Sequence, residues 1–265
     1  MSDFAKRYGP WAVVAGASEG LGASFAACLA RRGVHLVLLA RRLPLLHELA
    51  DALRGDHGVE VRCVALDLGD ADWPDALREA TADVELGLLV YNAAMVPVGR
   101  FVDTEADALE RSVRVNALAP VRFLRAFLPS LCARGRGGVV LMSSLSGLQG
   151  TPRVATYAAT KAFNAILAEG LWHELRSDGV DVVACSAGAV PTPGYLRSTD
   201  RRAPGMLPPD VVADRTLDAL GHGPGMVPGA LNRFMAQVIR RVLPRRTAIR
   251  LMAANTRHLV DPRRP

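Results

Sequence analysis

Short apolar runs alternate with amphipathic stretches along most of the chain. The runs expected to form strands are Trp11–Ala15, His35–Ala40, Val61–Leu66, Leu86–Tyr91, Gly138–Met142 and Val180–Cys185. Their apolar positions are nearly continuous, which is typical of strands covered on both faces of a parallel sheet. Helical periodicity lies between them, over Gly20–Arg32, Leu43–Arg54, Trp73–Thr81, Ala106–Ala133 and Thr156–Ser177. This alternation predicts one α/β domain over residues 1–265: a Rossmann-type, doubly wound parallel sheet with helices on both faces.

The regular pattern ends after residue 186. Residues 187–208 contain four prolines and three glycines, which excludes a regular helix there. Such a segment beside a site is often a mobile lid, and we expect a substrate lid loop, although an ordinary surface loop has the same composition. The apolar residues that would line a pocket under it are Val190, Tyr195, Leu196, Met206 and Leu207.

Residues 231–259 form a basic C-terminal helical segment. It combines seven arginines with leucine, isoleucine, valine and methionine, and Pro244 is expected to divide it into two helices. Two interpretations remain open. A basic amphipathic helix can make a peripheral contact with a membrane or an acidic partner. Alternatively, the segment packs on its own domain and turns an arginine face to solvent.

Composition narrows the range of partners. Half of the 265 residues are hydrophobic, so a large core can be buried. The formal net charge is +6, and the surplus is almost entirely arginine. This balance favours anionic ligands, or it reflects genomic base composition alone. Because no basic patch is interleaved with aromatic residues, no nucleic-acid partner is expected.

Cysteine and histidine patterns indicate no metal site. Cys28, Cys63, Cys132 and Cys185 are far apart and form neither a metal motif nor a disulfide framework. The six histidines show no spacing typical of metal ligands. No secretory signal and no membrane-spanning run is recognised. We therefore expect free thiols in a reducing compartment and a cytoplasmic location.

A glycine-rich turn follows the first predicted strand. Gly16, Gly20 and Gly22 frame the turn, and Ser18, Glu19 and Leu21 lie between them. Glycines let the backbone turn tightly and approach a pyrophosphate, and the N–H groups of the helix that starts near Gly20 can bind phosphate. The position between a strand and a helix is the context that a dinucleotide site requires.

Two arginines follow the second predicted strand, where an NAD site usually carries an acidic residue. Arg41 and Arg42 stand there instead, and arginine can hold a 2′-phosphate through two parallel hydrogen bonds. The expected cofactor is therefore NADP(H). The alternative is a solvated arginine pair at the start of a helix.

Tyr157 and Lys161 stand four residues apart near the start of a predicted helix, so they share one face. A free tyrosine has a pKa of about 10, too high for efficient proton exchange at neutral pH. A nearby ammonium group would stabilise the phenolate. Lys161 is one of only two lysines in an arginine-rich chain, which fits a site that needs a compact cation. Taken alone, such a pair is also common on helix surfaces.

Taken in order, these residues resemble the short-chain dehydrogenase/reductase superfamily over roughly residues 10–195. The positions that match its motifs are Gly16–Gly22, Asp67, Leu68, Asn92, Ala93, Ala94, Asn116, Ser144, Tyr157, Lys161, Gly188, Val190 and Thr192. The ordered set is specific, although each motif alone is not. The resemblance implies a homodimer or homotetramer formed through the long helices.

The resemblance also implies a catalytic set of Asn116, Ser144, Tyr157 and Lys161. Ser144 would bond the substrate carbonyl oxygen, and Tyr157 would exchange a proton with that oxygen. Lys161 would lower the pKa of Tyr157 and bond the nicotinamide ribose. Asn116 would hold a water that links Lys161 to solvent.

Cofactor contacts follow from the same resemblance. Asp67 and Leu68 would border the adenine, and Val190 and Thr192 would meet the nicotinamide carboxamide. Asn92, Ala93 and Ala94 would lie beside the nicotinamide-side ribose. Two departures from the family motif stand at this last place, where Tyr91 replaces an asparagine and Ala94 replaces a glycine.

These observations together predict an NADP(H)-dependent oxidoreductase that interconverts a ketone and a secondary alcohol. The segments 8–14 and 39–42 are similar to the branch that holds 3-oxoacyl-CoA reductases and hydroxysteroid dehydrogenases, which suggests an apolar fatty-acyl, steroid-like or polyketide carbonyl. Two alternatives remain: an NAD(H)-dependent alcohol dehydrogenase of the same fold, and a non-catalytic nucleotide-sensing protein. A hydrolase is disfavoured, because neither Ser143 nor Ser144 stands in a G-x-S-x-G turn.

Overall fold

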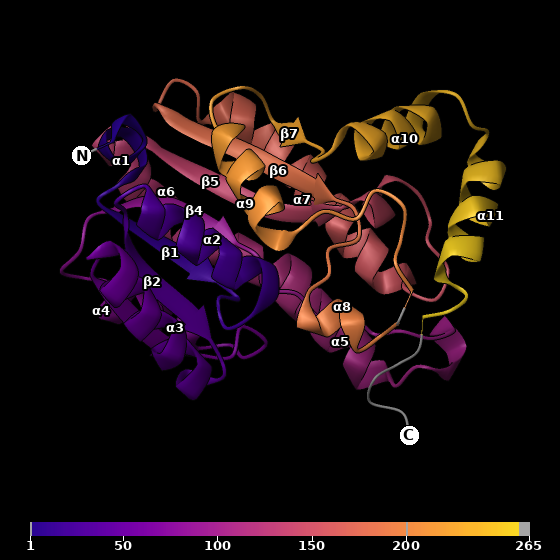
Figure 1. The fold of residues 1–265 in the computed structure, drawn as a ribbon, viewed down its shortest axis with the longest axis horizontal. Helices are drawn as coiled ribbons and strands as arrows, with labels where there is room; N and C mark the ends of the chain where they lie inside the picture. The colour runs from indigo at the N-terminus through magenta and orange to yellow at the C-terminus, as the bar shows by residue number, and fades with distance from the viewer. Residues whose placement is uncertain (1, 200, 260–265) are drawn as a thin grey trace.

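A seven-stranded, wholly parallel sheet forms the centre of the protein (Figure 1). The structure is a computed structural model and describes residues 2–199 and 201–259. The strand order is β3-β2-β1-β4-β5-β6-β7. The strands are β1 (Trp11–Ala15), β2 (His35–Ala40), β3 (Val61–Ala65), β4 (Leu86–Tyr91), β5 (Gly137–Ser144), β6 (Val180–Ala187) and β7 (Gly225–Met226). The order reverses between β1 and β4, as in a doubly wound sheet.

Helices cover both faces of the sheet. In chain order they are α1 (Asp3–Tyr8), α2 (Gly20–Arg31), α3 (Leu43–His57), α4 (Trp73–Ala80), α5 (Ala106–Val113), α6 (Ala119–Arg134), α7 (Ala155–Glu174), α8 (Pro193–Leu196), α9 (Pro209–Asp218), α10 (Ala230–Arg241) and α11 (Arg245–Thr256). One buried cluster joins α2, α3 and α9 to the sheet, and a second cluster joins α4, α6 and α7 to the opposite face. The predicted Rossmann-type fold is therefore confirmed.

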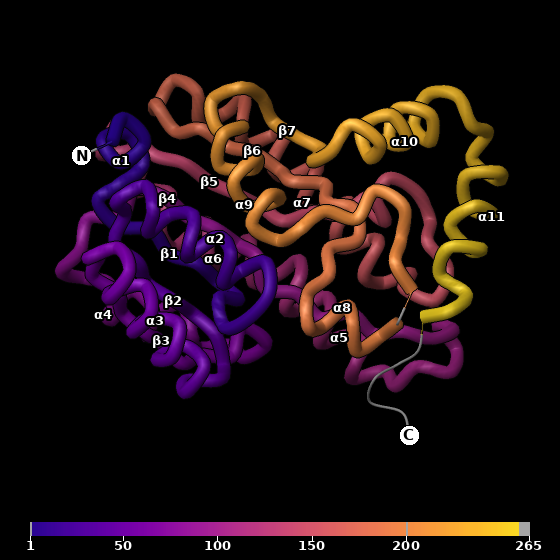
Figure 2. The backbone as a smooth tube through the Cα atoms, in the orientation of Figure 1, coloured from indigo at the N-terminus to yellow at the C-terminus, as the bar shows by residue number. Residues whose placement is uncertain are grey.

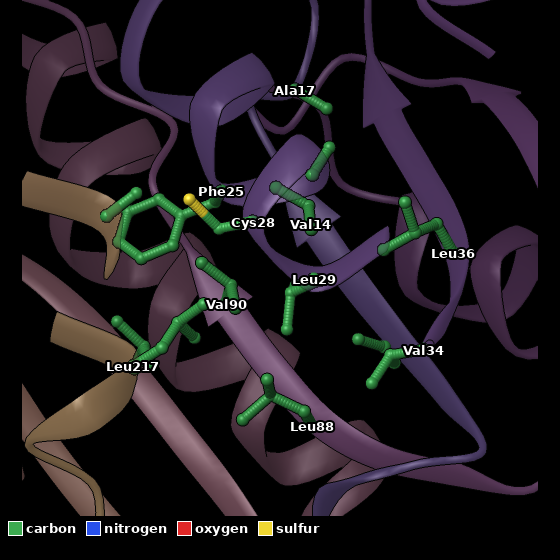
Figure 3. Packing of buried hydrophobic residues seen from close by; sticks show 14 of the residues in the cluster. Val14, Ala17, Phe25, Cys28, Leu29, Val34, Leu36, Leu88, Val90 and Leu217 are labelled. Carbon is green, nitrogen blue, oxygen red and sulfur yellow. The ribbon is translucent and has the colours of Figure 1, made fainter. Parts of the chain in front are cut away.

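The first of these clusters fixes α2 on the sheet. Phe25, Cys28 and Leu29 of α2 are fully buried and lie over side chains of β1, β2 and β4, as Figure 3 shows. Leu217 of α9 closes the same cluster (Figure 3). Each large side chain buried in this way stabilises the fold by roughly 2 kcal/mol. The packing holds the first turn of α2 at the carboxyl edge of β1, where the glycine-rich turn lies.

The strand predictions agree closely with the structure, but the helix predicted over Ala106–Ala133 is wrong as one continuous helix. It is divided into α5 and α6 by a π-helical turn, Arg114–Leu118. Pro120 explains the interruption. It has no N–H to donate to the carbonyl of Asn116, four residues earlier, and its ring would clash with that carbonyl in a regular helix. Short π turns of this kind often mark functional sites.

Four elements of the described residues were not predicted from the sequence: α1, α8, α9 and β7. The signal for α9 was present, because Val212, Ala213, Thr216 and Leu217 recur at helical spacing and are all buried. The two-residue β7 is too short to give a periodic pattern.

After β6, the segment predicted to lack a regular helix contains one short helix, and its role as a lid stays a prediction. Between Gly188 and Pro208 the only regular element in the described residues is the four-residue helix α8. Pro244 separates α10 from α11, as predicted. Both helices lie beyond β7 at one end of the molecule, and the chain turns sharply between them (Figure 2).

Two hydrogen bonds attach α11 to the loop between β5 and α7, and a third attaches the residues just after the helix. Arg245 Nη1 donates to the Leu148 carbonyl (2.9 Å), and Thr256 Oγ1 donates to the Pro152 carbonyl (3.0 Å). Arg153 Nη2 donates to the carbonyl of Leu259 (2.7 Å). The interpretation that this segment packs on its own domain is thus confirmed for α11.

Candidate active site

The residues singled out from the sequence gather at the carboxyl edge of the sheet. Gly16 follows β1, Asn92 follows β4, Ser144 ends β5 and Gly188 follows β6. Because the strand order reverses between β1 and β4, a crevice for a ligand is expected at this edge. The fold therefore brings together residues that are up to 172 positions apart in the sequence.

Close backbone approach explains the three glycines of the turn. Gly16 has φ +82°, and a Cβ there would lie 2.7 Å from the Ala93 backbone nitrogen. A Cβ on Gly22 would lie 1.9 Å from the Gly16 carbonyl oxygen, and one on Gly20 (φ +59°) would lie 2.9 Å from the Thr192 side chain. No larger residue fits at these positions without movement of the backbone or of Thr192.

The turn fits a dinucleotide. Glu19 is the N-cap of α2 but its side chain makes no capping hydrogen bond, so the first amide groups of the helix have no side-chain partner there. Those amides, together with Gly16 and Ser18, form the kind of cradle that binds a pyrophosphate. Leu21 is buried beneath it.

Asn92 ties the turn to the end of β4. Its Nδ2 donates to the Gly16 carbonyl (3.0 Å), and the backbone amides of Asn92 and Ala93 both donate to the Ala15 carbonyl (3.0 and 2.9 Å). Ala94 is exposed next to them. The expected ribose-side segment therefore lies against the glycine-rich turn.

Tyr91 corrects one expectation. Its side chain does not lie beside a ribose site, because it points into the core, where it is 1% exposed and packs edge-on against Phe123. Its hydroxyl donates to the Val115 carbonyl in the π turn (2.7 Å). Successive side chains of a strand point to opposite faces of the sheet, so the Tyr91 side chain points to the face covered by α6 although the residue stands at the carboxyl end of β4. Tyr91 thereby supports the turn that carries Asn116.

Arg41 and Arg42 flank the glycine-rich turn. Arg42 Nη2 donates to Ser18 Oγ (3.0 Å) and pairs with Glu19 (3.1 Å). Arg41 lies 3.9 Å from Asp67, and its side chain is 67% exposed, so it is available to a ligand. A hydroxyl and two guanidinium groups near one turn suit a phosphate monoester.

Asp67 is held in place by its neighbours. One carboxylate oxygen accepts from the Gly69 amide (2.8 Å), and the other pairs with Arg111. Leu68 is buried beside it. These contacts fix the loop after β3, where the resemblance places the adenine.

The segment after β6 lies over the glycine-rich turn. Thr192 approaches Gly20, and its Oγ1 accepts from the Tyr195 amide as the cap of α8 (3.2 Å). Val190 is buried. Arg197 Nη2 donates to Glu19 (3.0 Å), which attaches the expected lid to the turn from the other side.

Asn116 is fully buried within the π turn. Its side chain exchanges two hydrogen bonds with the backbone of Met95, each 2.8 Å long, and Nδ2 also donates to Thr160 Oγ1 (3.1 Å). Thr160 Oγ1 in turn donates to the Tyr157 carbonyl (2.8 Å). Asn116 therefore positions the first turn of α7.

Ser144, Tyr157 and Lys161 come together where β5 meets α7. Ser144 is close enough to Tyr157 for its hydroxyl to lower the pKa of Tyr157, and Ser144 Oγ accepts from the Ser146 amide (3.1 Å). Lys161 Nζ lies 5.6 Å from the centre of the Tyr157 ring and donates to the Met142 carbonyl (2.8 Å). Ser143 Oγ donates to the Lys161 carbonyl (2.7 Å), which locks the helix to the strand.

The charges at this site differ from the expectation drawn from the sequence. Burial raises the pKa of Tyr157 above its ordinary value, and the hydrogen bond with Ser144 only partly offsets this effect. Burial also lowers the pKa of Lys161 to about 8, with an opposing effect of Cys185. In the structure, Lys161 does not bring the pKa of Tyr157 below its usual value, because its ammonium group is directed to Met142 and is itself destabilised by desolvation.

Comparisons with known proteins agree with this geometry. The family model described as short chain dehydrogenase matches residues 10–202. The chain belongs to the short-chain dehydrogenase family. It is 35% identical to the 7beta-hydroxysteroid dehydrogenase of Clostridium sardiniense over 235 residues, which cover 87% of this chain and 90% of that protein. Members of this family are oxidoreductases that act on hydroxyl and keto groups, and so is this protein.

Two further relatives are informative. The very-long-chain 3-oxoacyl-CoA reductase of Podospora anserina is 38% identical over 181 residues, 66% of this chain and 53% of that protein. The structure of a short-chain dehydrogenase from Sphingobium yanoikuyae in complex with NADPH matches with a TM-score of 0.76 at 33% identity, over 83% of this chain and 87% of that one. The resemblance to the hydroxysteroid dehydrogenase and 3-oxoacyl-CoA reductase branch is thus confirmed.

Several residues of this short-chain dehydrogenase were not identified from the sequence. Asn164 is fully buried one turn after Lys161, and its Nδ2 points to the same Met142 carbonyl (3.5 Å). Its spacing from Lys161 was a signal that could have revealed it. Asn232 of α10 is also buried, and it donates to the carbonyls of Gly205 (2.9 Å) and Pro228 (3.0 Å). No local sequence pattern predicts a role for Asn232, because its hydrogen-bond partners are backbone carbonyls of loops.

We predict that Lys161→Met increases the stability of the ligand-free enzyme at neutral pH. The folded pKa of Lys161 is about 8 and its ordinary value 10.5, so the folded state penalises the cation fully below pH 8, and the penalty disappears as pH rises to 10.5. Removal of this penalty raises the free energy of unfolding, and loss of the hydrogen bond to Met142 lowers it. The expected net gain is about 2 kcal/mol. Urea unfolding at neutral pH and near pH 10 measures it.

The matched control is Lys6→Met, which replaces the exposed lysine of α1. It should change the free energy of unfolding by less than about 0.5 kcal/mol at either pH. A stability difference between Lys161→Met and the parent protein that is the same at both pH values would contradict the pKa argument.

Proposed function

We propose that this short-chain dehydrogenase uses NADP(H) to interconvert an apolar ketone and the corresponding secondary alcohol. One observation carries the proposal: Ser144, Tyr157 and Lys161 lie together at the sheet edge that also holds the glycine-rich turn. The intact set speaks against the alternative of a non-catalytic nucleotide-sensing protein.

Ser144 and Tyr157 have different roles in the proposed reaction. Ser144 donates a hydrogen bond to the substrate oxygen and stabilises its developing negative charge. Tyr157 delivers a proton to that oxygen during reduction. Because burial raises the pKa of Tyr157, its proton is retained at neutral pH, which suits a proton donor. NADP(H), when bound, supplies or accepts the hydride.

Lys161 and Asn116 act on the same proton. Lys161 donates a hydrogen bond toward the nicotinamide ribose and replaces the proton that Tyr157 gives up, a role for which a pKa of about 8 is suitable. Asn116, through Thr160, holds the first turn of α7 so that Tyr157 keeps its position. The route from Lys161 to solvent through water at Asn116 belongs to this proposal.

NADP(H) is proposed over NAD(H) from the charges around the turn. Arg41, Arg42 and Ser18 offer donors for a 2′-phosphate, and the end of β2 has no acidic residue to bond a ribose hydroxyl. The relative from Sphingobium yanoikuyae was solved with NADPH. Asp67 and Leu68 would border the adenine. Gly188, Val190 and Thr192 would meet the nicotinamide end.

An apolar substrate is supported by the relatives of this chain and by apolar side chains on the surface beside Tyr157. Phe101 and Leu109 lie there in a shallow hollow, together with Thr104, Arg153 and Thr156. The relatives named above act on hydroxysteroids and very long-chain 3-oxoacyl-CoA. We propose that residues 187–208 form a lid over this side, with apolar Leu196 exposed on it and Arg197 attached to Glu19.

The proposed enzyme is a cytoplasmic homodimer or homotetramer. All four cysteines are free, which agrees with a reducing compartment. Exposed apolar side chains that would meet a second copy lie on the long helices α5, α6 and α7 and on the π turn, at Val113, Leu118, Val121, Phe163 and Ile166.

A side-by-side titration with NADPH and NADH, followed by a turnover screen, tests the function. The screen offers 7-oxosteroids and 3-oxoacyl-CoA esters for reduction. We expect a clear preference for NADPH and turnover of at least one of these apolar ketones. Preference for NADH would support the alcohol dehydrogenase alternative. Binding of neither nucleotide would support the non-catalytic alternative.

A further inference from the structure

Positive charge is concentrated in the last part of the chain. Between Ala219 and Leu259 there are seven arginines and neither aspartate nor glutamate. The formal charge of the whole chain is only +6, so this one segment accounts for the entire surplus. A charge distributed at random by base composition would not be expected to exclude acidic residues from about 40 consecutive positions.

The structure leaves these arginines in solvent. All seven are exposed, and within residues 2–199 and 201–259 none of them takes part in an ion pair. Most arginines elsewhere that take part in ion pairs have a carboxylate within about 3 Å. The segment thus presents unneutralised positive charge.

Helix α10 adds an apolar stripe to this charge. Leu231, Phe234 and Val242 are 50%, 64% and 70% exposed. Together with the half-buried Val238 they recur at positions i, i+3, i+7 and i+11, which is one face of a helix. Asn232 and Ala236 are buried and attach the opposite side to the protein.

The arginines of α10 lie on the polar side of the helix. At 100° per residue, Arg241 borders the stripe next to Phe234, whereas Arg233 and Arg240 lie about 100° or more from its nearest residue. An exposed apolar face with arginines on the polar face is the pattern of helices that lie in the interface of an anionic bilayer. Figure 1 shows α10 and α11, in yellow, at one end of the molecule, beyond β7 and away from the strands β1–β4.

We propose that the α10 face, defined as Leu231, Phe234, Val238, Val242 and the arginines Arg233, Arg240 and Arg241, docks on an anionic phospholipid surface. Charge complementarity favours lipid over a second copy of this chain, because two copies of a face this basic would repel each other. No described helix is long and apolar enough to cross a membrane, so the contact is peripheral. An apolar substrate dissolved in the bilayer would then be close to the site.

Co-sedimentation of the full-length protein with vesicles tests this. One set is phosphatidylcholine alone, and the other contains about one third phosphatidylglycerol. Binding is expected to the second set only, and to weaken with salt. Arg233→Gln/Arg240→Gln/Arg241→Gln should lower the partition coefficient roughly 100-fold. Leu231→Ser/Phe234→Ser should lower it about tenfold or more.

Matched controls separate this face from general charge and apolarity. Arg125→Gln/Arg176→Gln/Arg215→Gln changes the net charge equally at exposed arginines on other elements. Phe101→Ser/Val102→Ser removes side chains that are 61% and 76% exposed elsewhere. Both controls should keep the partition coefficient within about threefold of the parent protein. Retained thermal unfolding shows that each variant is folded.

Three results would overturn the proposal. The first is equal binding to both vesicle types or to neither. The second is an equal loss in the α10 variants and their controls. The third is an assembly that Leu231→Ser/Phe234→Ser splits into smaller species in size-exclusion chromatography without any vesicle binding, which would assign the face to a second copy. None of these results depends on NADPH or on turnover, so the proposed function is tested separately.

Discussion

Tyr157→Phe is expected to lower kcat for ketone reduction about a thousandfold. The substitution keeps the ring and its packing and removes only the hydroxyl. Ser144 still donates a hydrogen bond to the substrate oxygen, but its hydroxyl is too weak an acid to deliver the proton, and Ser143 Oγ is committed to the Lys161 carbonyl. Steady-state assays with NADPH and a ketone substrate measure the effect.

The control for this prediction is Tyr8→Phe, which removes the hydroxyl that donates to Asp181 from α1, before the start of β1. It should leave kcat within about twofold of the parent enzyme. Because Tyr157 is also an expected cofactor contact, NADPH affinity is measured in parallel, and the loss of kcat should exceed any loss of affinity. Near-normal turnover by Tyr157→Phe would refute its role as the acid.

Arg41→Ala should weaken NADPH binding about 30-fold while NADH binding changes by less than about threefold. Arg41 is 67% exposed and lies 3.9 Å from Asp67, so its guanidinium is available to a 2′-phosphate, a group that NADH lacks. Fluorescence titration of both nucleotides with the same protein measures the two affinities.

Arg78→Ala, at an exposed arginine of α4, is the matched control and should leave both affinities unchanged. Arg42→Ala also removes the bond to Ser18, so it should weaken NADPH binding as well. Equal losses for NADPH and NADH in Arg41→Ala would show that Arg41 does not select the cofactor.

Six of the seven strands were predictable because strands that are buried on both faces consist of nearly continuous apolar residues. The break in the long helix before α6 was not predicted, although Pro120 was visible. Pro120 lies in the interior of the predicted helix, where a proline kinks or breaks a helix, so the sequence carried a signal for the break. Only the structure shows that the break is a π turn, which is supported by the bond from the Tyr91 hydroxyl to Val115. The misplacement of Tyr91 has a similar origin, because a motif gives the order of residues but not the face of a strand.

The sequence predicted which residues form the candidate site, but it did not predict how burial shifts the pKa values of Tyr157 and Lys161. The spacing of Tyr157 and Lys161 indicated a shared helix face, and the structure agrees. Spacing did not reveal that Met142 and Asn164 surround Lys161, or that burial would dominate both pKa values. These effects depend on groups that are distant in the sequence.

The sequence by itself determined the alternation of strands and helices of a parallel α/β fold, the glycine-rich turn and the ordered motif set, because periodicity and local backbone requirements are properties of neighbouring residues. Only the tertiary structure decided what each side chain meets: Thr192 over Gly20, Arg42 on Ser18, and α11 on the loop before α7. It also decided which arginines are neutralised, since ion pairing requires proximity in space, whereas a sequence records only charge and order.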